Sequence, residues 1–413
     1  MLKLPQINLV MRIENIESNW VMFLGLFAAA FLISATSVMV YSLRSTDSQE
    51  VVASAQAEAV SSPDPDINYI PTKKQEIIAF LPSWVIAKNE KLNLDKLSQL
   101  IYFGIGVNED GSLVKIKDGG DAVLEWQYLN SDVFKEIRKE AEQNNTKILV
   151  ALKNFDNQEI DQLISDPYAI GKFIKEASLL IEDYDLDGIN IDFEYVTQSD
   201  FPTAKHFNGF LSEVTQSLRE KYPDIVISVD LNATAVLVDP AYDMVKIGEL
   251  ADQVILMGYD YHTMKSSQAG PIAPLHAMAK SGGSIEKSLE SLTGRVPDDK
   301  TILGIPFYGY EWETVSENYQ SETVRNSGAL ATWGRVHDLL ESRDDIQANW
   351  DTKTQSPWIV YKQSGAIKQI YYENRHSLSA KMNFVKQNNL GGIAIWALGY
   401  EGDHKEAWDI IFL

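Results

Sequence analysis

The chain contains 413 residues, of which 45% are hydrophobic, enough for one large domain or two ordinary ones. It contains no cysteine, which excludes disulfide bonds, thiolate metal sites and cysteine nucleophiles. The formal net charge of −22 argues against a nucleic-acid partner, because binding to phosphate backbones requires clusters of Lys and Arg.

An uncharged apolar segment occupies residues 20–43, after a short tail at residues 1–19. As a helix it would span roughly 36 Å at 1.5 Å per residue, enough to cross a bilayer core of about 30 Å. We expect a single-pass anchor in the cell membrane, with the folded domain on the extracytoplasmic side. The alternative is secretion after signal cleavage near the small residues at 53–59, although signal peptides usually have apolar runs of about 7–15 residues.

Residues 44–72 are rich in Ser, Ala, Asp and Pro and show neither a helical nor a strand period. This composition is typical of a flexible tether, because it offers little apolar surface to bury. We therefore expect the folded domain to occupy residues 73–413.

Short apolar runs alternate with amphipathic helical stretches through that domain. Eight such strands in one chain favour a (β/α)8 TIM barrel, and an open doubly wound sheet is the main alternative. The helical stretches lie at 131–143, 166–184, 204–221 and 376–388. A small α+β insertion is expected at about 311–370, between the seventh and eighth strands. The strands are expected at 76–81, 98–106, 147–152, 186–193, 225–230, 253–258, 301–306 and 391–396.

The fourth expected strand carries a row of polar residues. Asn190, Asp192 and Glu194 alternate with Ile189, Ile191 and Phe193, so one face is polar and the other apolar. We expect the polar row to point into the barrel and to reach its C-terminal end, where active sites of such barrels lie. The alternative is a hydrogen-bonded polar layer inside the barrel. Asp187 has the opposite parity and is expected to face outward in a structural role.

The segment DGINIDFE at 187–194 resembles the signature strand of glycoside hydrolase family 18, the chitinase family. Three further segments resemble motifs of the same family in the same order: LMGYDY at 256–261, LGIPFYGYEW at 303–312 and LGGIAIWALGYEGD at 390–403. The segment AGPIAPL at 269–275 and the insertion resemble the spore-cortex glucosaminidase branch. The resemblance covers roughly residues 75–413.

The resemblance implies a role for each matching residue. Glu194 would be the general acid, and Asp192 would orient the 2-acetamido group of the substrate, which serves as the nucleophile in this family. Tyr259 would donate a hydrogen bond to the acetamido carbonyl, Asp260 would hold the distorted sugar and Met257 would line the pocket. Trp396 would stack beneath the sugar ring.

The residues themselves support this chemistry. Asp192 and Glu194 approach the substrate from one side, and two neighbouring carboxylates raise one pKa, which helps to keep Glu194 protonated. Four aromatic residues follow strand ends and could form either sugar platforms or parts of the core: Phe80, Trp84, Tyr310 and Trp312.

Two features depart from the family pattern. Asn190 stands where the family usually has Asp, and its amide is expected to donate a hydrogen bond to ionised Asp192. The third strand ends in ALKNFD, at 151–156, where the family often has SxGG, which leaves the substrate fit open.

The sequence therefore predicts a membrane-anchored glycosidase that cleaves β-1,4-linked N-acetylglucosamine polymers, either chitin or peptidoglycan, by a substrate-assisted retaining mechanism. The alternative is a catalytically silent sugar-binding protein on the same barrel. The presence of Glu194 favours the enzyme. No metal motif is visible, and neither a cofactor nor a nucleic-acid partner is expected.

Overall fold

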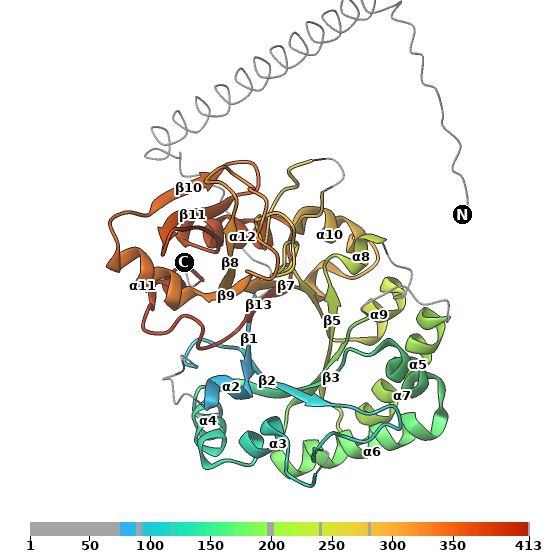
Figure 1. Ribbon diagram of the computed structural model, residues 1–413. Helices are drawn as coiled ribbons and strands as arrows, with labels where there is room; N and C mark the ends of the chain where they lie inside the picture. Colours follow the sequence, from blue (N-terminus) through green and yellow to red (C-terminus); the bar gives the residue numbers. More distant parts are fainter. Residues whose placement is uncertain are drawn as a thin grey trace, which may run out of the picture. The chain divides into compact units, whose positions relative to one another are not determined.

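Eight parallel strands close into a barrel in the computed structural model, which describes residues 75–87, 92, 94–117, 119–195, 202–238, 242–279 and 282–411. Around the barrel the order is β1-β13-β7-β6-β5-β4-β3-β2 (Figure 1). All eight predicted strands and the predicted barrel are confirmed. The barrel strands are β1 (Glu76–Pro82), β2 (Gln99–Gly106), β3 (Lys147–Asn154), β4 (Gly188–Phe193), β5 (Val226–Asn232), β6 (Gln253–Met257), β7 (Thr301–Pro306) and β13 (Gly392–Trp396).

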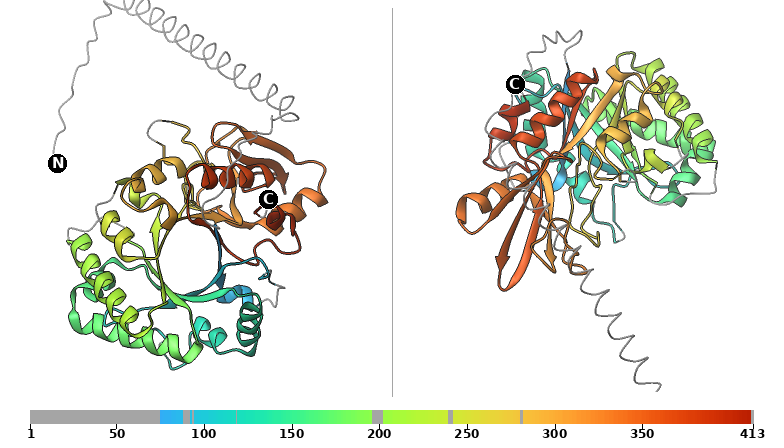
Figure 2. Two further views of the ribbon diagram at one scale, coloured as in Figure 1. Left: turned by 180° about the vertical axis from the view of Figure 1, so that it is seen from behind. Right: turned by 90° about the horizontal axis from the view of Figure 1, so that it is seen from above.

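Helices surround the barrel (Figures 1 and 2). The helix α6 shows how the sequence sets their ends, because Asp166 caps the N-terminus by accepting from the backbone N–H of Tyr168 (2.9 Å) and Pro167 occupies the first turn. The helices are α2 (Ser83–Ile86), α3 (Leu124–Leu129), α4 (Asp132–Gln143), α5 (Asn157–Ser165), α6 (Pro167–Tyr184), α7 (Thr203–Lys221), α8 (Ala235–Val238), α9 (Met244–Leu250), α10 (Ile285–Leu292), α12 (Arg375–Gln387) and α13 (Glu406–Ile411), with a 3-10 turn at Asp298–Lys300.

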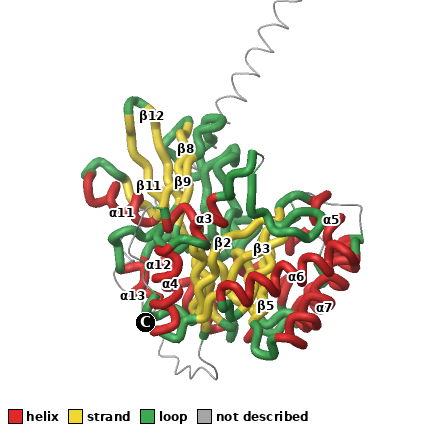
Figure 3. Tube along the Cα trace, turned by 90° about the horizontal axis from the view of Figure 1, so that it is seen from below, coloured by secondary structure: helices red, strands yellow, loops and turns green. Residues whose placement is uncertain are grey.

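The segment between β7 and β13 forms a separate antiparallel sheet with one helix, α11 (Trp333–Ser342), before the chain continues into α12. In the sheet the strand order is β10-β11-β12-β8-β9. Figure 3 shows β8, β9, β11 and β12 projecting beyond one end of the barrel strands. This is the α+β insertion expected at about 311–370. Its strands are β8 (Tyr308–Thr314), β9 (Ala329–Thr332), β10 (Gln347–Asp351), β11 (Ser356–Gln363) and β12 (Ala366–Tyr371).

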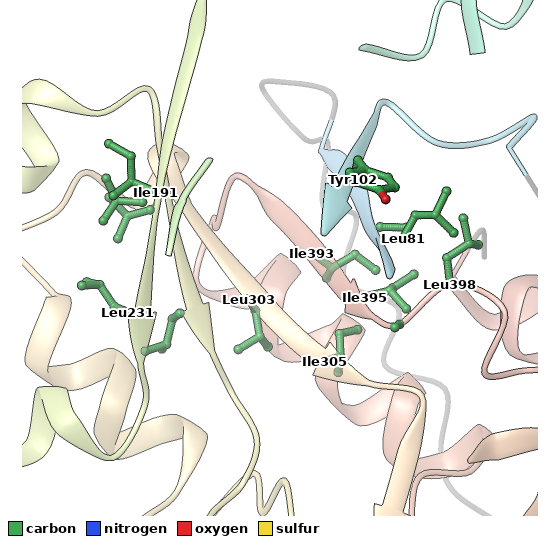
Figure 4. Packing of buried hydrophobic residues seen from close by; sticks show 14 of the residues in the cluster. Leu81, Tyr102, Ile191, Leu231, Leu303, Ile305, Ile393, Ile395 and Leu398 are labelled. Carbon is green, nitrogen blue, oxygen red and sulfur yellow. The ribbon is translucent and has the colours of Figure 1, made fainter. Parts of the chain in front are cut away.

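The barrel strands bury both of their faces. The outward side chains pack against the helices in one large apolar cluster, part of which is shown in Figure 4 with Ile191, Leu231 and Leu303 among its labelled residues. A second apolar cluster fills the inside of the barrel and includes Ile78, Ile101, Leu149, Ile255, Ile302 and Ala394. On β4 and β5 four buried inward positions are polar, at Asn190, Asp192, Ser228 and Asp230. These two neighbouring strands thus place a group of polar side chains inside the barrel.

The predicted tail (1–19), membrane anchor (20–43) and linker (44–72) all lie outside the residues that the structure describes. Within the described part of the chain, no helix has the length and apolar character needed to cross a bilayer.

Candidate active site

The polar row of β4 faces the inside of the barrel. Asn190 and Asp192 are buried, and Glu194, which follows the strand, is partly exposed. The alternate residues face the helices, where the ring of Phe193 packs against aromatic rings of α6 and α7. The backbone N–H of Glu194 donates to the carbonyl of Asn154 on β3 (3.0 Å), which fixes the strand end. The row therefore rises from the barrel interior to the C-terminal end of the strands.

A second polar row on the neighbouring strand β5 meets the first. Ser228, Asp230 and Asn232 alternate with apolar residues, as the polar residues of β4 do. The Asn190 amide donates to Ser228 Oγ (3.0 Å) and to Asp230 Oδ1 (2.7 Å). The Asn232 amide donates to Glu194 Oε2 (3.1 Å). The two strands thus form one polar network on one side of the barrel.

The prediction that Asn190 donates a hydrogen bond to Asp192 is wrong. An amide group has two hydrogens, and those of Asn190 are directed across the sheet to Ser228 and Asp230. Asp192 Oδ1 and Asn190 Oδ1 are both buried and have no hydrogen-bond partner among the described residues. Asp192 therefore keeps an oxygen that a substrate or a proton can engage.

Burial and mutual repulsion favour the protonated forms of these acids. Burial raises the pKa of Asp192 well above the usual aspartate range, and the charges of Asp230 and Glu194 raise it further. Burial also raises the pKa of Asp230 and of Glu194. The ammonium group of Lys153 acts in the opposite direction and lowers the pKa of Asp192. The site thus holds more carboxyl groups than it can ionise together.

Asn232 is held in one orientation. Its Oδ1 accepts from the backbone N–H of Thr234 (3.0 Å), the hydroxyl of Thr234 (2.8 Å) and the backbone N–H of Ala235 (3.2 Å). Because the oxygen is fixed by these donors, the NH2 group must face Glu194. This donor lowers the pKa of Glu194 and partly offsets the effect of burial.

Three predicted residues lie at the end of β6. Met257 is buried, and Tyr259 and Asp260 are partly buried. Gly304 on β7 gives Tyr259 its space, since a Cβ at that position would lie 3.2 Å from the tyrosine ring. Burial, followed by the charges of Asp230 and Asp260, raises the pKa of Tyr259 well above its usual value, so its hydroxyl remains a neutral donor.

Asp260 is held by two tyrosines of the insertion. The hydroxyl groups of Tyr308 and Tyr310 donate to Asp260 Oδ1 at 2.6 and 3.0 Å. Asp260 has a φ of 61°, in the left-handed region that residues other than glycine seldom adopt and that often occurs at functional sites. The first strand of the insertion therefore completes this side of the site.

Aromatic residues of β1, β2 and β13 face the polar rows. The ring of Trp396 lies 4.6 Å from that of Phe103 and 5.6 Å from that of Phe80. Trp84 is partly exposed, and its indole N–H donates to the hydroxyl of Tyr400 (3.2 Å). Phe80 is only 2% exposed, so it supports Trp396 from within the barrel and offers no open face to a sugar.

The interpretation of Trp312 as a sugar platform is wrong. Trp312 is 0% exposed, and its indole N–H donates to the carbonyl of Thr263 (3.2 Å). Its strand belongs to the insertion sheet, where the ring packs between Tyr310 and Tyr371. A residue that follows β7 in sequence is thus buried in another layer of the molecule.

A cavity of about 520 Å³ lies at the opposite end of the barrel. It is lined by residues that precede β3 and β4, among them Asn145 and Asp185, and by α4. It contains none of the predicted site residues. Among the described residues, no group of three or more His, Cys, Asp or Glu side chains is placed to hold a metal ion.

Comparison with known proteins agrees with this geometry. Residues 76–401 match the family described as Glycosyl hydrolases family 18. The chain belongs to glycosyl hydrolase family 18. It is therefore a member of a glycosidase family, as the four motifs predicted.

Proteins from distant organisms resemble the chain. It is 23% identical over 355 residues to "Probable chitinase 2" of Drosophila melanogaster, covering 79% of this chain and 72% of that protein. It is 24% identical over 354 residues to the "Cortical fragment-lytic enzyme" of Bacillus anthracis, covering 80% and 74%.

Solved structures show the same fold. The Group IV chitinase of Ostrinia furnacalis in complex with allosamidin superposes with a TM-score of 0.71 at 19% identity, covering 82% of this chain and 98% of that one. The spore cortex-lytic enzyme SleL of Bacillus megaterium superposes with a TM-score of 0.64 at 20% identity, covering 85% and 75%.

Proposed function

We propose that the protein hydrolyses β-1,4-linked N-acetylglucosamine polymers, chitin or peptidoglycan, by a retaining mechanism in which the acetamido group of the substrate is the nucleophile. The observation that carries the proposal is the arrangement of Asp192 and Glu194 on one face of β4 at the C-terminal end of the barrel. An enzyme that uses its own carboxylate as nucleophile needs an acid and a nucleophile that flank the bond. Here both approach from the same side.

Glu194 is proposed as the general acid. Burial raises its pKa, which keeps its proton available near neutral pH, and the remaining exposure lets a glycosidic oxygen reach it. The Asn232 amide at 3.1 Å fixes Oε2 and leaves Oε1 to carry the proton toward the substrate. As the proton moves to the leaving oxygen, this donor also stabilises the carboxylate that forms.

Asp192 and Tyr259 are proposed to hold the acetamido group. The buried Asp192 can accept a hydrogen bond from the acetamido N–H, which orients the carbonyl oxygen toward the anomeric carbon. Tyr259, whose high pKa keeps it protonated, can donate to that oxygen. Positive charge develops on the nitrogen as the ring closes, and the Asp192 carboxylate, whose ionised form the Lys153 charge favours, stabilises it. Trp396 would form the floor beneath the sugar.

Cell location is a further part of the proposal. The apolar segment 20–43 supports an uncleaved anchor in the cell membrane, with the barrel on the extracytoplasmic side. The names of the relatives support both polymers, since one is called a probable chitinase and another a cortical fragment-lytic enzyme.

A thiazoline analogue, which copies the cyclised intermediate, tests the nucleophile. It should inhibit hydrolysis strongly, because the site is complementary to that charge distribution. Asp192→Ala should weaken this inhibition, and Asp192→Asn should weaken it less because the size is kept. A covalent sugar adduct on any Asp or Glu would refute the substrate-assisted mechanism.

A further inference from the structure

A lysine lies beside Asp192 in the site. Lys153 is the last inward-facing residue of β3, after Leu149 and Ala151, and its Cα pairs with that of Asp192 across the sheet. It is partly buried, at the same level of the barrel as the proposed catalytic groups.

The ammonium group is held by aromatic rings. Lys153 Nζ lies 4.7 Å from the ring centre of Phe103 and 5.7 Å from that of Phe155, which is 43% exposed. The stem is also fixed, because it fills the space left by Gly104, where a Cβ would lie 3.1 Å from Lys153 Cδ. Contacts of this kind attract a cation to the ring faces without neutralising its charge.

None of the described carboxylates forms an ion pair with Lys153 within 4.0 Å. This is unexpected in a chain of net charge −22, because Asp192 lies opposite Lys153 on the neighbouring strand. The positive charge acts on Asp192 through space and partly opposes the rise of the Asp192 pKa that burial causes. Since none of the described carboxylates engages the ammonium group, it can bind an anion that enters the site from solvent.

We propose that Lys153 is a specificity-determining residue that binds a carboxylate carried by the polysaccharide. This inference rests on the proposed glycosidase function and narrows its substrate class. Chitin is neutral and carries no such group. Peptidoglycan carries carboxylates in two places, on the 3-O-lactyl group of N-acetylmuramic acid once the peptide is removed, and on the stem peptide itself. Lys153 therefore favours a peptidoglycan-type substrate over chitin.

A purely electrostatic role of Lys153 would have a different consequence from carboxylate binding. If Lys153 only tunes the ionisation of Asp192, its removal changes the hydrolysis of every substrate by the same factor. If it binds a carboxylate, its removal lowers kcat/KM more on carboxylated substrates than on neutral ones. The ratio of the two kcat/KM values is thus the decisive readout.

The experiment compares the full-length chain with Lys153→Met, which keeps the length of the side chain but removes its charge, and with Lys153→Arg, which keeps the charge. The substrates are N-acetylglucosamine oligomers, peptide-free glycan strands with lactyl carboxylates, the same strands as methyl esters, and strands that retain stem peptides. Lys246→Met, on an exposed lysine of α9, controls for the change in net charge.

In Lys153→Met the ratio of carboxylated to neutral hydrolysis should fall about tenfold or more, the factor expected for losing a hydrogen bond between charged groups. Lys153→Arg should keep most of the wild-type ratio, and Lys246→Met should keep the whole of it. A loss confined to the lactyl strands or to the peptide-bearing strands identifies the carboxylate. If Lys153→Met leaves the ratio unchanged for both the lactyl strands and the peptide-bearing strands, the proposal is overturned.

A binding measurement separates this inference from the proposed function. Glu194→Gln with Lys153 intact should bind the carboxylated strands more tightly than their methyl esters, as measured by calorimetry. Equal affinity refutes the role of Lys153 even if the Lys153 variants do not fold. If the wild-type chain cleaves neither polymer but binding still prefers the carboxylate, the proposed hydrolysis fails while the specificity of Lys153 stands.

Discussion

Replacement of Glu194 by Gln isolates the proton that the mechanism requires. Glutamine has nearly the same volume, and its carbonyl oxygen can still accept from the Asn232 amide, which lies 3.1 Å from Glu194 Oε2. It cannot donate a proton to the glycosidic oxygen. General acid catalysis typically accounts for about 10²–10⁴-fold in rate, which corresponds to roughly 3–5 kcal/mol at 1.36 kcal/mol for each factor of ten.

We therefore expect kcat of Glu194→Gln to fall by at least about a hundredfold, with little change in the dissociation constant for a substrate oligomer. Folding should not suffer, because the amide resembles the neutral acid that burial favours. Glu159→Gln is the matched control, since Glu159 Oε2 accepts from Asn154 (2.9 Å) at the end of β3 and an amide oxygen can replace it. Steady-state hydrolysis measures kcat, and calorimetry measures the dissociation constant. Hydrolysis by Glu194→Gln within a factor of two of wild type would refute the assignment.

Three further predictions follow from the same groups and from the N-terminal segment. Because burial raises the folded-state pKa of Asp230, the folded protein binds more protons than the unfolded chain, so its stability should fall as pH rises from about 4 toward neutral. Asp230→Asn should reduce this fall in a series of urea titrations, and an unchanged pH dependence would contradict the raised pKa. Asn232→Ala removes the donor that lowers the pKa of Glu194, so the alkaline limb of the kcat/KM profile should move to higher pH, and a move to lower pH would contradict this role. The full-length protein should stay in the membrane fraction after a high-salt wash, because salt screens charge but not hydrocarbon burial, whereas a mature N-terminus near residue 57 would indicate cleavage.

Alternation along the strands was sufficient to predict the barrel and one wall of the site. The inward parity of Asp192 and the outward parity of Asp187 follow from the two-residue period, and Asp187 indeed accepts from the backbone N–H of Ile148 (2.8 Å). The same period could have revealed Ser228, Asp230 and Asn232, which alternate with Ile, Val and Leu. The run at 225–230 does not identify them by itself, because its Ile and Val residues give it the composition of an ordinary apolar strand.

Contacts across the fold could not be predicted from local patterns. The partners of the Asn190 amide depend on the register of β4 against β5, which pairs Asn190 with Ser228. The hydrogen bonds from Tyr308 and Tyr310 to Asp260 depend on where the insertion places β8 relative to the end of β6. The sequence around Lys153 gives no sign of a site, because a lysine at a strand end usually points to solvent, and only the pairing of β3 with β4 brings it beside Asp192.

Product analysis by mass spectrometry shows directly whether the protein hydrolyses N-acetylated glycans. The full-length chain is incubated separately with N-acetylglucosamine oligomers, with peptidoglycan and with glucose oligomers of the same length and linkage. We expect shorter products with intact acetamido groups from at least one of the N-acetylated substrates, and no cleavage of the glucose oligomers. Intact N-acetylated substrates, or glucose oligomers cleaved at a comparable rate, would contradict it.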